Sequence, residues 1–249
     1  MELDGGASMT PPRCQFDVKC TNAPLKGVNP FCRIHTNLFK RTSRQLKARL
    51  SGWEPIYMPS IYNDPQKLVQ SNHNCFAYAF DILDLDDCKP TDDSKKCRKP
   101  FHQPGYFAGH SKFTEDGKKY CPDLIARLLG DMPWIKKTTF ERRCPKNHSK
   151  IALVIDPDND YHFYRQDRDG FWSHKPGGQP VTNLDAARKR IYNPELANRD
   201  YRKPGFPKKD QLNYSIFCSF LSVPRYHRVT AKRGGGLATR KRNYTRKRH

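Results

Sequence analysis

Residues 150–174 read KIALVIDPDNDYHFYRQDRDGFWSH, and the prediction of an antiparallel hairpin rests on them. The first seven, 150–156, form an apolar run that ends in an acidic turn, which is typical of a buried strand. Aromatic residues then recur through 160–165, where a second strand is expected. The turn at 167–170 ends in Asp-Gly and separates two aromatic runs, which is a strong hairpin signal.

The segments around this hairpin predict a mixed α+β domain. A helix is expected to follow Asn72 or Asn74 as its N-cap, because a polar run changes there into an apolar stripe with helical spacing. A second helix is expected over 122–130, where proline suits the first turn and glycine the end. The apolar run 214–223 predicts a final strand that closes the sheet, with Cys218 buried in it.

Cys75 is the candidate nucleophile, since a thiol at a helix start lies near unpaired backbone N–H groups that favour the thiolate. His162 and His174 lie near the two outer ends of the predicted hairpin, which makes them cross-strand neighbours. We therefore expect His162 to act as the base and His174 to hold it, with Asn183 or Asp185 as alternative orienting groups. The alternative for Cys75 is a buried small apolar residue, and for His162 a hydrogen-bonded strand histidine.

The order of these residues resembles the NlpC/P60 branch of papain-like cysteine peptidases, in which a cysteine at a helix start precedes a histidine on a strand. The likeness covers roughly residues 72–178. Around the nucleophile the chain has Asn-Cys-Phe-Ala at 74–77, closer to the Cys-x-x-Tyr-Ala pattern of CHAP-type amidases. The Trp-Ser-His-Lys-Pro-Gly run at 172–177 is also similar to uncharacterised bacterial and large-virus proteins. The resemblance implies a papain-like core with a helix-start cysteine packed on an antiparallel sheet.

Together these features predict a thiol hydrolase that cleaves, or transfers at, an amide bond of a peptide or protein. His162 would take the proton of Cys75, and the thiolate would attack the carbonyl without a catalytic cofactor. The alternative is a non-enzymatic protein, associated with nucleic acid or with a virion, whose papain-like core is inactive.

The N-terminal segment carries four soft ligands with the spacing C-x5-C-x11-C-x2-H. Such ligands suit tetrahedral zinc, and turn-forming residues between them indicate that something other than an apolar core holds the segment together. We expect a structural zinc knuckle over 1–38, similar to short Cys/His knuckles of viral and phage proteins, with unpaired reduced thiols as the alternative. The predicted ligands are Cys14, Cys20, Cys32 and His35.

The C-terminal tail, 225–249, contains ten Lys or Arg residues and no acidic residue. Such a block repels itself and is expected to be disordered. It is a candidate for non-specific contact with nucleic acid, for nuclear import, or for solubility alone. The candidate phosphate contacts are Arg240, Lys241, Arg242, Arg246, Lys247 and Arg248.

The remaining expectations come from composition. The 249 residues carry a formal net charge of +21 and an odd number of cysteines, nine, which does not favour a scaffold of regular disulfides. No stretch is apolar enough to insert into a membrane, and the first residues lack the features of a signal peptide. We expect a cytoplasmic or nuclear protein, or a virion or host-cytoplasm location if it is viral. A basic, aromatic linker over 39–62 would join the knuckle to the main domain over 63–224.

Overall fold

The computed structural model describes only part of the chain. It describes residues 46, 49–63, 69–82, 103–113, 117–205, 207 and 211–225, together with the backbone of 227–231 and 237–241. The predicted α+β class is confirmed, since an antiparallel sheet is combined with a few short helices. None of the described helices is long and apolar enough to cross a membrane.

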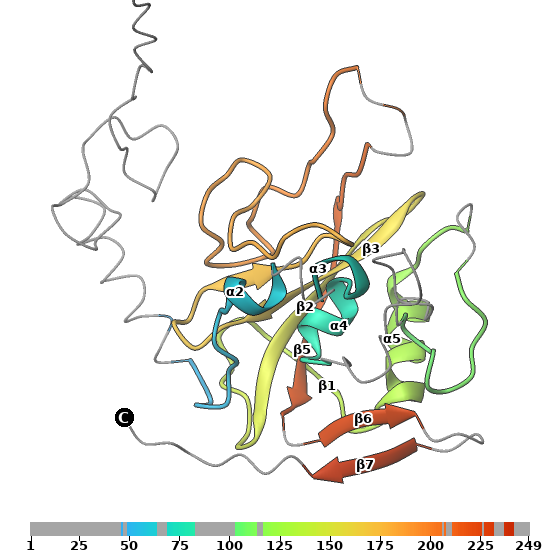
Figure 1. Cartoon of the computed structure of the whole chain (residues 1–249), viewed down its shortest axis with the longest axis vertical. Helices are drawn as coiled ribbons and strands as arrows, with labels where there is room; N and C mark the ends of the chain where they lie inside the picture. Colours follow the sequence, from blue (N-terminus) through green and yellow to red (C-terminus); the bar gives the residue numbers. More distant parts are fainter. Residues whose placement is uncertain are drawn as a thin grey trace, which may run out of the picture.

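Five strands form the main sheet in the order β1-β5-β2-β3-β4, and all neighbours in it are antiparallel. The hairpin predicted from 150–174 is confirmed, because β2 pairs with β3 and β3 pairs with β4 (Figure 1). The predicted final strand is also confirmed and lies between β1 and β2. The strands are β1 Lys136–Thr138, β2 His148–Asp156, β3 Asp160–Gln166, β4 Trp172–His174 and β5 Ile216–Pro224.

Both expected helices are present, and both pack against the same face of the sheet. They are α4, Cys75–Ala79, and α5, Cys121–Asp131. Their apolar side chains share one core cluster with side chains of β2, β3 and β5, including Leu128, Leu153 and Phe163. Short helices α2, Pro59–Tyr62, and α3, Val69–Asn72, precede α4 in the chain.

The opposite face of the sheet is covered by the chain that follows β4. Residues 176–205 contain no helix or strand beyond isolated bridges and run as a long loop (Figure 1). Ile191 from this loop is buried in a second core cluster with Tyr164, Trp172 and Phe220, and Tyr201 packs against it. The sheet therefore has helices on one face and an irregular layer on the other.

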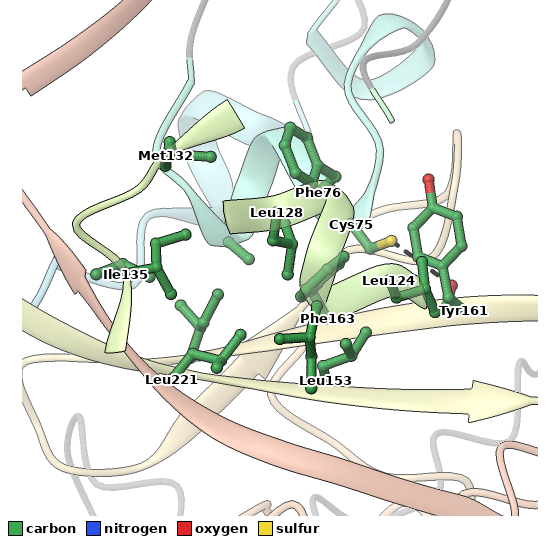
Figure 2. Close-up of a cluster of buried hydrophobic side chains, with 14 of the residues drawn as sticks. Cys75, Phe76, Leu124, Leu128, Met132, Ile135, Leu153, Tyr161, Phe163 and Leu221 are labelled. Atoms are coloured by element: carbon green, nitrogen blue, oxygen red, sulfur yellow. Dashed lines mark hydrogen bonds between the residues drawn. The ribbon is translucent and has the colours of Figure 1, made fainter. Parts of the chain in front are cut away.

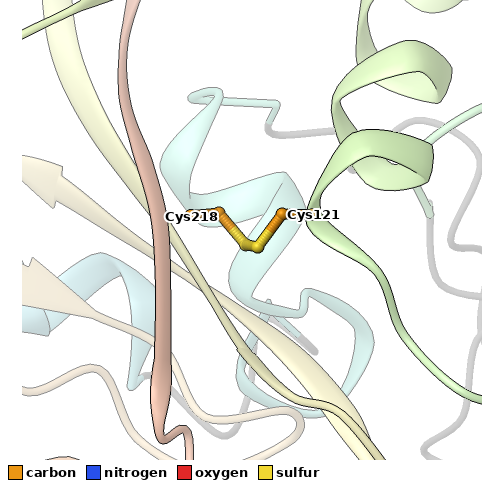
Figure 3. Close-up of a disulfide and its surroundings, with 2 residues drawn as sticks. All are labelled: Cys121 and Cys218. Carbon is orange, nitrogen blue, oxygen red and sulfur yellow. A yellow bond between two sulfur atoms is a disulfide. The ribbon is translucent and has the colours of Figure 1, made fainter.

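A disulfide joins helix α5 to strand β5 of the main sheet. Cys121 opens α5 and Cys218 lies on β5, with their Cα atoms 5.3 Å apart (Figure 3). That separation lies within the range that a disulfide requires. The expectation that Cys218 is simply a buried thiol is therefore wrong: it is only half-buried, and it is bonded to a cysteine 97 positions earlier. Sequence spacing missed this pair because only the packing of α5 on β5 brings the two residues together.

Part of the basic tail forms a separate hairpin, although the sequence predicts disorder over 225–249. Strand β6, His227–Ala231, pairs in antiparallel register with β7, Leu237–Lys241. Each strand carries a β-branched residue, such as Val229 and Thr239, and three glycines lie between the strands in the sequence. The prediction of disorder rested on the density of basic residues and took no account of these weak strand signals.

Candidate functional site

Cys75 lies where the sequence predicts it, at the first residue of α4. The Asn74 side chain accepts a hydrogen bond of 3.0 Å from the backbone N–H of Ala77, which confirms Asn74 as the N-cap. The helix is only five residues long, and all five are buried. Cys75 thus belongs to the core cluster between α4, α5 and the sheet.

The thiol of Cys75 is held in its protonated form. Figure 2 shows the sulfur directed at β3, where it lies 3.9 Å from the backbone oxygen of Tyr161. Only 6% of the residue is exposed. Burial raises the pKa of Cys75 to about 12, and the nearby Asp160 carboxylate adds to the increase. Backbone hydrogen bonds from Phe163 on β3 and from Phe76 on α4 oppose this shift but do not overcome it.

His162 and His174 form the pair that the hairpin prediction expects. Nε2 of His162 lies 2.8 Å from Nδ1 of His174, and the two rings are nearly perpendicular. Both side chains are buried. Burial lowers the pKa of His174 to about 4, and burial together with the neighbouring His174 holds the pKa of His162 well below the usual histidine value. Both imidazoles are therefore neutral at neutral pH.

The structure does not bring Cys75 and His162 together. Tyr161 and Phe163 face α4 and share a core cluster with Cys75. His162 lies between these two residues on β3 and faces the opposite way, with its ring near Tyr164 and Tyr214. Because side chains alternate along a strand, the sheet itself separates the thiol from the imidazole. The expected contact between Cys75 and His162 is therefore wrong: the sequence placed His162 correctly on the strand but on the wrong face of the sheet.

The group that orients His174 is a backbone carbonyl. Nε2 of His174 lies 2.9 Å from the oxygen of Leu184. Asp185, an expected orienting residue, instead accepts hydrogen bonds from the backbone N–H groups of Lys189 and Asn198. The backbone oxygen of Asn183, the other candidate, accepts from the N–H of Ile191. Neither side chain is hydrogen-bonded to either imidazole, and a backbone acceptor leaves no signal in the residue type.

Lys175 is the charged residue that sequence reasoning missed near Cys75. Its side chain is fully buried, and Nζ donates to the backbone oxygens of Gln70, Gly177 and Gln179 at 2.5, 2.7 and 3.0 Å. Burial lowers the pKa of Lys175 to about 8, while the electrostatic influence of Cys75 acts in the opposite direction. The three carbonyls use all three N–H donors of the ammonium group, so Lys175 serves to join the loop after β4 to α3.

A second buried cation, Arg165, organises the helix face of the sheet. Its guanidinium lies 3.9 Å from the centre of the Tyr78 ring and donates from Nε to Asp167 at 3.1 Å. It also donates to the backbone oxygen of Ile56 at 3.0 Å. Tyr78 in turn shares a 2.6 Å hydrogen bond with Ser173 on β4. These contacts hold together α4, β3, β4 and the segment before α2, so Arg165 forms the centre of a structural network.

The predicted metal and nucleic-acid residues lie largely outside the described chain. Neither the four zinc ligands expected near the N-terminus nor the basic residues after position 241 belong to it. Arg240 and Lys241 are on β7, where the backbone alone is described. Within the described residues, no three His, Cys, Asp or Glu side chains gather as a metal site would require.

The fold and site define a disulfide-linked α+β protein whose buried thiol and imidazole pair occupy opposite faces of one sheet. No protein-family model matches the chain, and no solved structure matches it. A curated relative is insoluble matrix shell protein 1 from Ruditapes philippinarum, which is 32% identical over 176 residues. The alignment covers 70% of this chain and 93% of the relative. The chain therefore belongs to the family of insoluble matrix shell protein 1.

Proposed function

We propose that this chain is a non-enzymatic structural protein of an insoluble protein matrix. The name of its relative assigns that protein to the insoluble matrix of a shell, and the alignment spans nearly all of the relative. The alternative that the sequence offers to a hydrolase is a non-enzymatic protein associated with nucleic acid or with a virion, and the arrangement of the site likewise favours a non-enzymatic role.

The observation that carries this proposal is the separation of Cys75 from His162 by the sheet. A thiol hydrolase needs a nucleophile and a base within hydrogen-bond reach of one another. Here the thiol contacts a backbone oxygen, and the imidazole contacts another imidazole. The thiol is also protonated at neutral pH, which is the unreactive form.

The disulfide supports a matrix outside the reducing compartments of a cell. Disulfides persist in oxidising surroundings and are rare in cytosolic and nuclear proteins. We therefore propose that the chain works in an extracellular matrix, in place of the cytoplasmic or nuclear location that composition favours. The Cys121–Cys218 bond would hold α5 to the sheet there.

We infer that the core is a papain-like scaffold of the NlpC/P60 type that has lost its catalytic pair. The capped helix that begins at Cys75 and packs on an antiparallel hairpin supports this relationship. The zinc knuckle and the basic tail remain proposed sites for structural zinc and for polyanions such as nucleic acid.

A thiol hydrolase acting on peptide or protein amides is the second candidate. The position of Cys75 at a capped helix start favours it, as does the electrostatic influence of Lys175 on the thiol. It would need a base other than His162 and a conformation that opens the thiol to substrate.

Alkylation of the folded full chain separates the two candidates. Iodoacetamide is applied at pH 7, and modification of Cys75 is followed by peptide mass spectrometry, with Cys144 as the matched control because it is also a free buried cysteine. The proposal expects both to react more slowly than free glutathione, and it expects Cys75→Ala to sediment with an insoluble matrix preparation as the wild type does. Faster alkylation of Cys75 than of glutathione would overturn it.

A further inference from the structure

The imidazole pair lies beneath the loop that covers one face of the sheet. His162 is on β3 and His174 on β4, while Leu184, whose oxygen binds His174, belongs to the covering segment 176–205. We propose that the His162–His174 pair is an acid-sensitive latch that holds segment 176–205 on the sheet. The inference concerns a conformational change of the fold and does not depend on the proposed matrix role.

The backbone oxygen of Leu184 fixes the direction of both hydrogen bonds, from His162 to His174 and from His174 to Leu184. A carbonyl oxygen only accepts, so Nε2 of His174 must carry a proton toward Leu184. In the neutral ring Nδ1 of His174 is then an acceptor, and Nε2 of His162 must donate to it. One tautomer of each ring is therefore selected, and Nδ1 of His162 carries no proton.

Two protons are needed to break this arrangement. A first added proton can be shared, because either ring can donate to the other after a change of tautomer. A second proton places N–H donors on both atoms of the 2.8 Å contact and puts two positive charges side by side. Hydrogen bonding and electrostatics then both oppose the pair.

The surroundings do not favour the charged forms. Burial is the largest influence on both imidazoles and lowers both pKa values, whereas the Asp185 carboxylate acts weakly in the other direction on His174. Ala152, Val154 and Phe220 supply apolar side chains of β2 and β5 to the same face. The titratable groups facing the pair are Tyr164 from β3, Tyr201 and Asp185 from the covering segment, and Tyr214 with its hydrogen-bonded partner Asp160.

Release of the latch would uncover apolar surface. The covering segment buries Ile191 against Tyr164, Trp172 and Phe220. Its other attachments near the latch include paired backbone hydrogen bonds between His174 and Thr182 and an ion pair between Arg190 and Asp169. The segment is also hydrogen-bonded to Asn63 through Val181, to Trp172 through Ile191 and to Tyr214 through Arg199, so we infer an opening of the part around Leu184 that leaves the helix face folded. The uncovered face would then favour self-association.

Hydrogen exchange on the full chain from pH 7 to pH 4, corrected for intrinsic exchange rates, tests the proposal. We expect 176–205 to lose protection at least tenfold as the pH falls, with a slope above one proton, while α5 stays protected. His162→Gln and His174→Gln keep an amide donor but remove one titrating ring, so each should reduce the slope to one proton or less. His110→Gln, at an exposed site in 103–113, is the matched control and should behave as wild type.

Three results would overturn the latch. The first is protection of 176–205 that does not change between pH 7 and pH 4. The second is loss of protection in α5 at the same pH, which would show global unfolding. The third comes from wild-type protein alone, by imidazole NMR: a protonated Nδ1 on His174 at pH 7 would contradict the assigned tautomers even if both glutamine variants failed to fold.

Discussion

Cys75 and His162 pack against opposite faces of β3, even though the sulfur of Cys75 contacts the backbone oxygen of Tyr161, the residue directly before His162. One position along a strand reverses the direction of a side chain. A residue that is adjacent in sequence to the thiol's contact therefore lies across the sheet from it. This relationship is the main support for the proposed structural role.

The reactivity of Cys75 should not depend on His162. Since burial raises the pKa of the thiol to about 12, its alkylation rate should still rise about tenfold per pH unit near pH 10, whereas the rate for an exposed cysteine is half-maximal near pH 8.5 and levels off about one unit higher. The pH profile of iodoacetamide labelling should be the same in wild type and in His162→Gln. A profile with a midpoint below pH 7 that moves upward in His162→Gln would contradict this and restore the catalytic pair.

The core between α5 and the sheet should be sensitive to truncation at Leu128. This side chain is fully buried, so Leu128→Ala should lower the free energy of unfolding by about 2–5 kcal/mol. The next residue, Leu129, is 40% exposed and supplies the control, because Leu129→Ala should change the free energy of unfolding by about 0.5 kcal/mol or less. Urea unfolding followed by circular dichroism measures both. Equal effects at the two positions would mean that α5 does not pack as described.

Reduction of the Cys121–Cys218 disulfide should destabilise the fold. The bond closes a long loop, since its cysteines are 97 positions apart in the sequence, and disulfides typically contribute roughly 2–4 kcal/mol. Thermal unfolding with and without a reducing agent measures the loss. In the double variant Cys121→Ala/Cys218→Ala the reducing agent should have no further effect. A drop of the same size in that variant would assign the effect to other cysteines.

Removal of the buried Arg165 charge should lower the free energy of unfolding more than removal of the charge of an exposed arginine. Arg165 and Asp167 are both buried, so Arg165→Gln leaves a carboxylate without its cation and should lower the free energy of unfolding by about 3–5 kcal/mol. Arg202 pairs with Asp200 on the exposed surface, and Arg202→Gln should give no measurable change in the same urea titration. Comparable losses in the two variants would argue against a structural centre at Arg165.

Stability should fall in mild acid because of the buried imidazoles. The pKa of His174 is about 4 in the folded protein and 6.5 without the fold's influence, so the unfolded chain binds more protons between these values. The stability that neutral His174 contributes to the folded protein is complete above pH 6.5. It is lost as the pH falls toward 4, by about 1.4 kcal/mol per pH unit at most. The slope of unfolding free energy against pH should be smaller in His174→Gln than in wild type. An unchanged slope would mean that His174 titrates normally.

Much of the fold was predictable from local patterns. The Asn74 cap before an apolar stripe marked α4, the proline and glycine at the ends of 122–130 marked α5, and the Asp-Gly turn marked the β3–β4 hairpin. The His162–His174 contact also followed from the hairpin, although the register places Tyr164 directly opposite His174 and makes His162 its diagonal neighbour. The β6–β7 hairpin was missed because its basic composition concealed weak strand signals.

The sequence by itself determined helices α4 and α5, the strands of the β2–β3–β4 hairpin, the α+β class and the local pairing across the hairpin, because these depend on residues a few positions apart. Tertiary structure alone decided which face of β3 meets α4, which cysteines form a disulfide and which carbonyl binds His174. Those outcomes depend on how elements far apart in the chain pack, and a shift of one residue in that packing would exchange the faces of His162 and Tyr161.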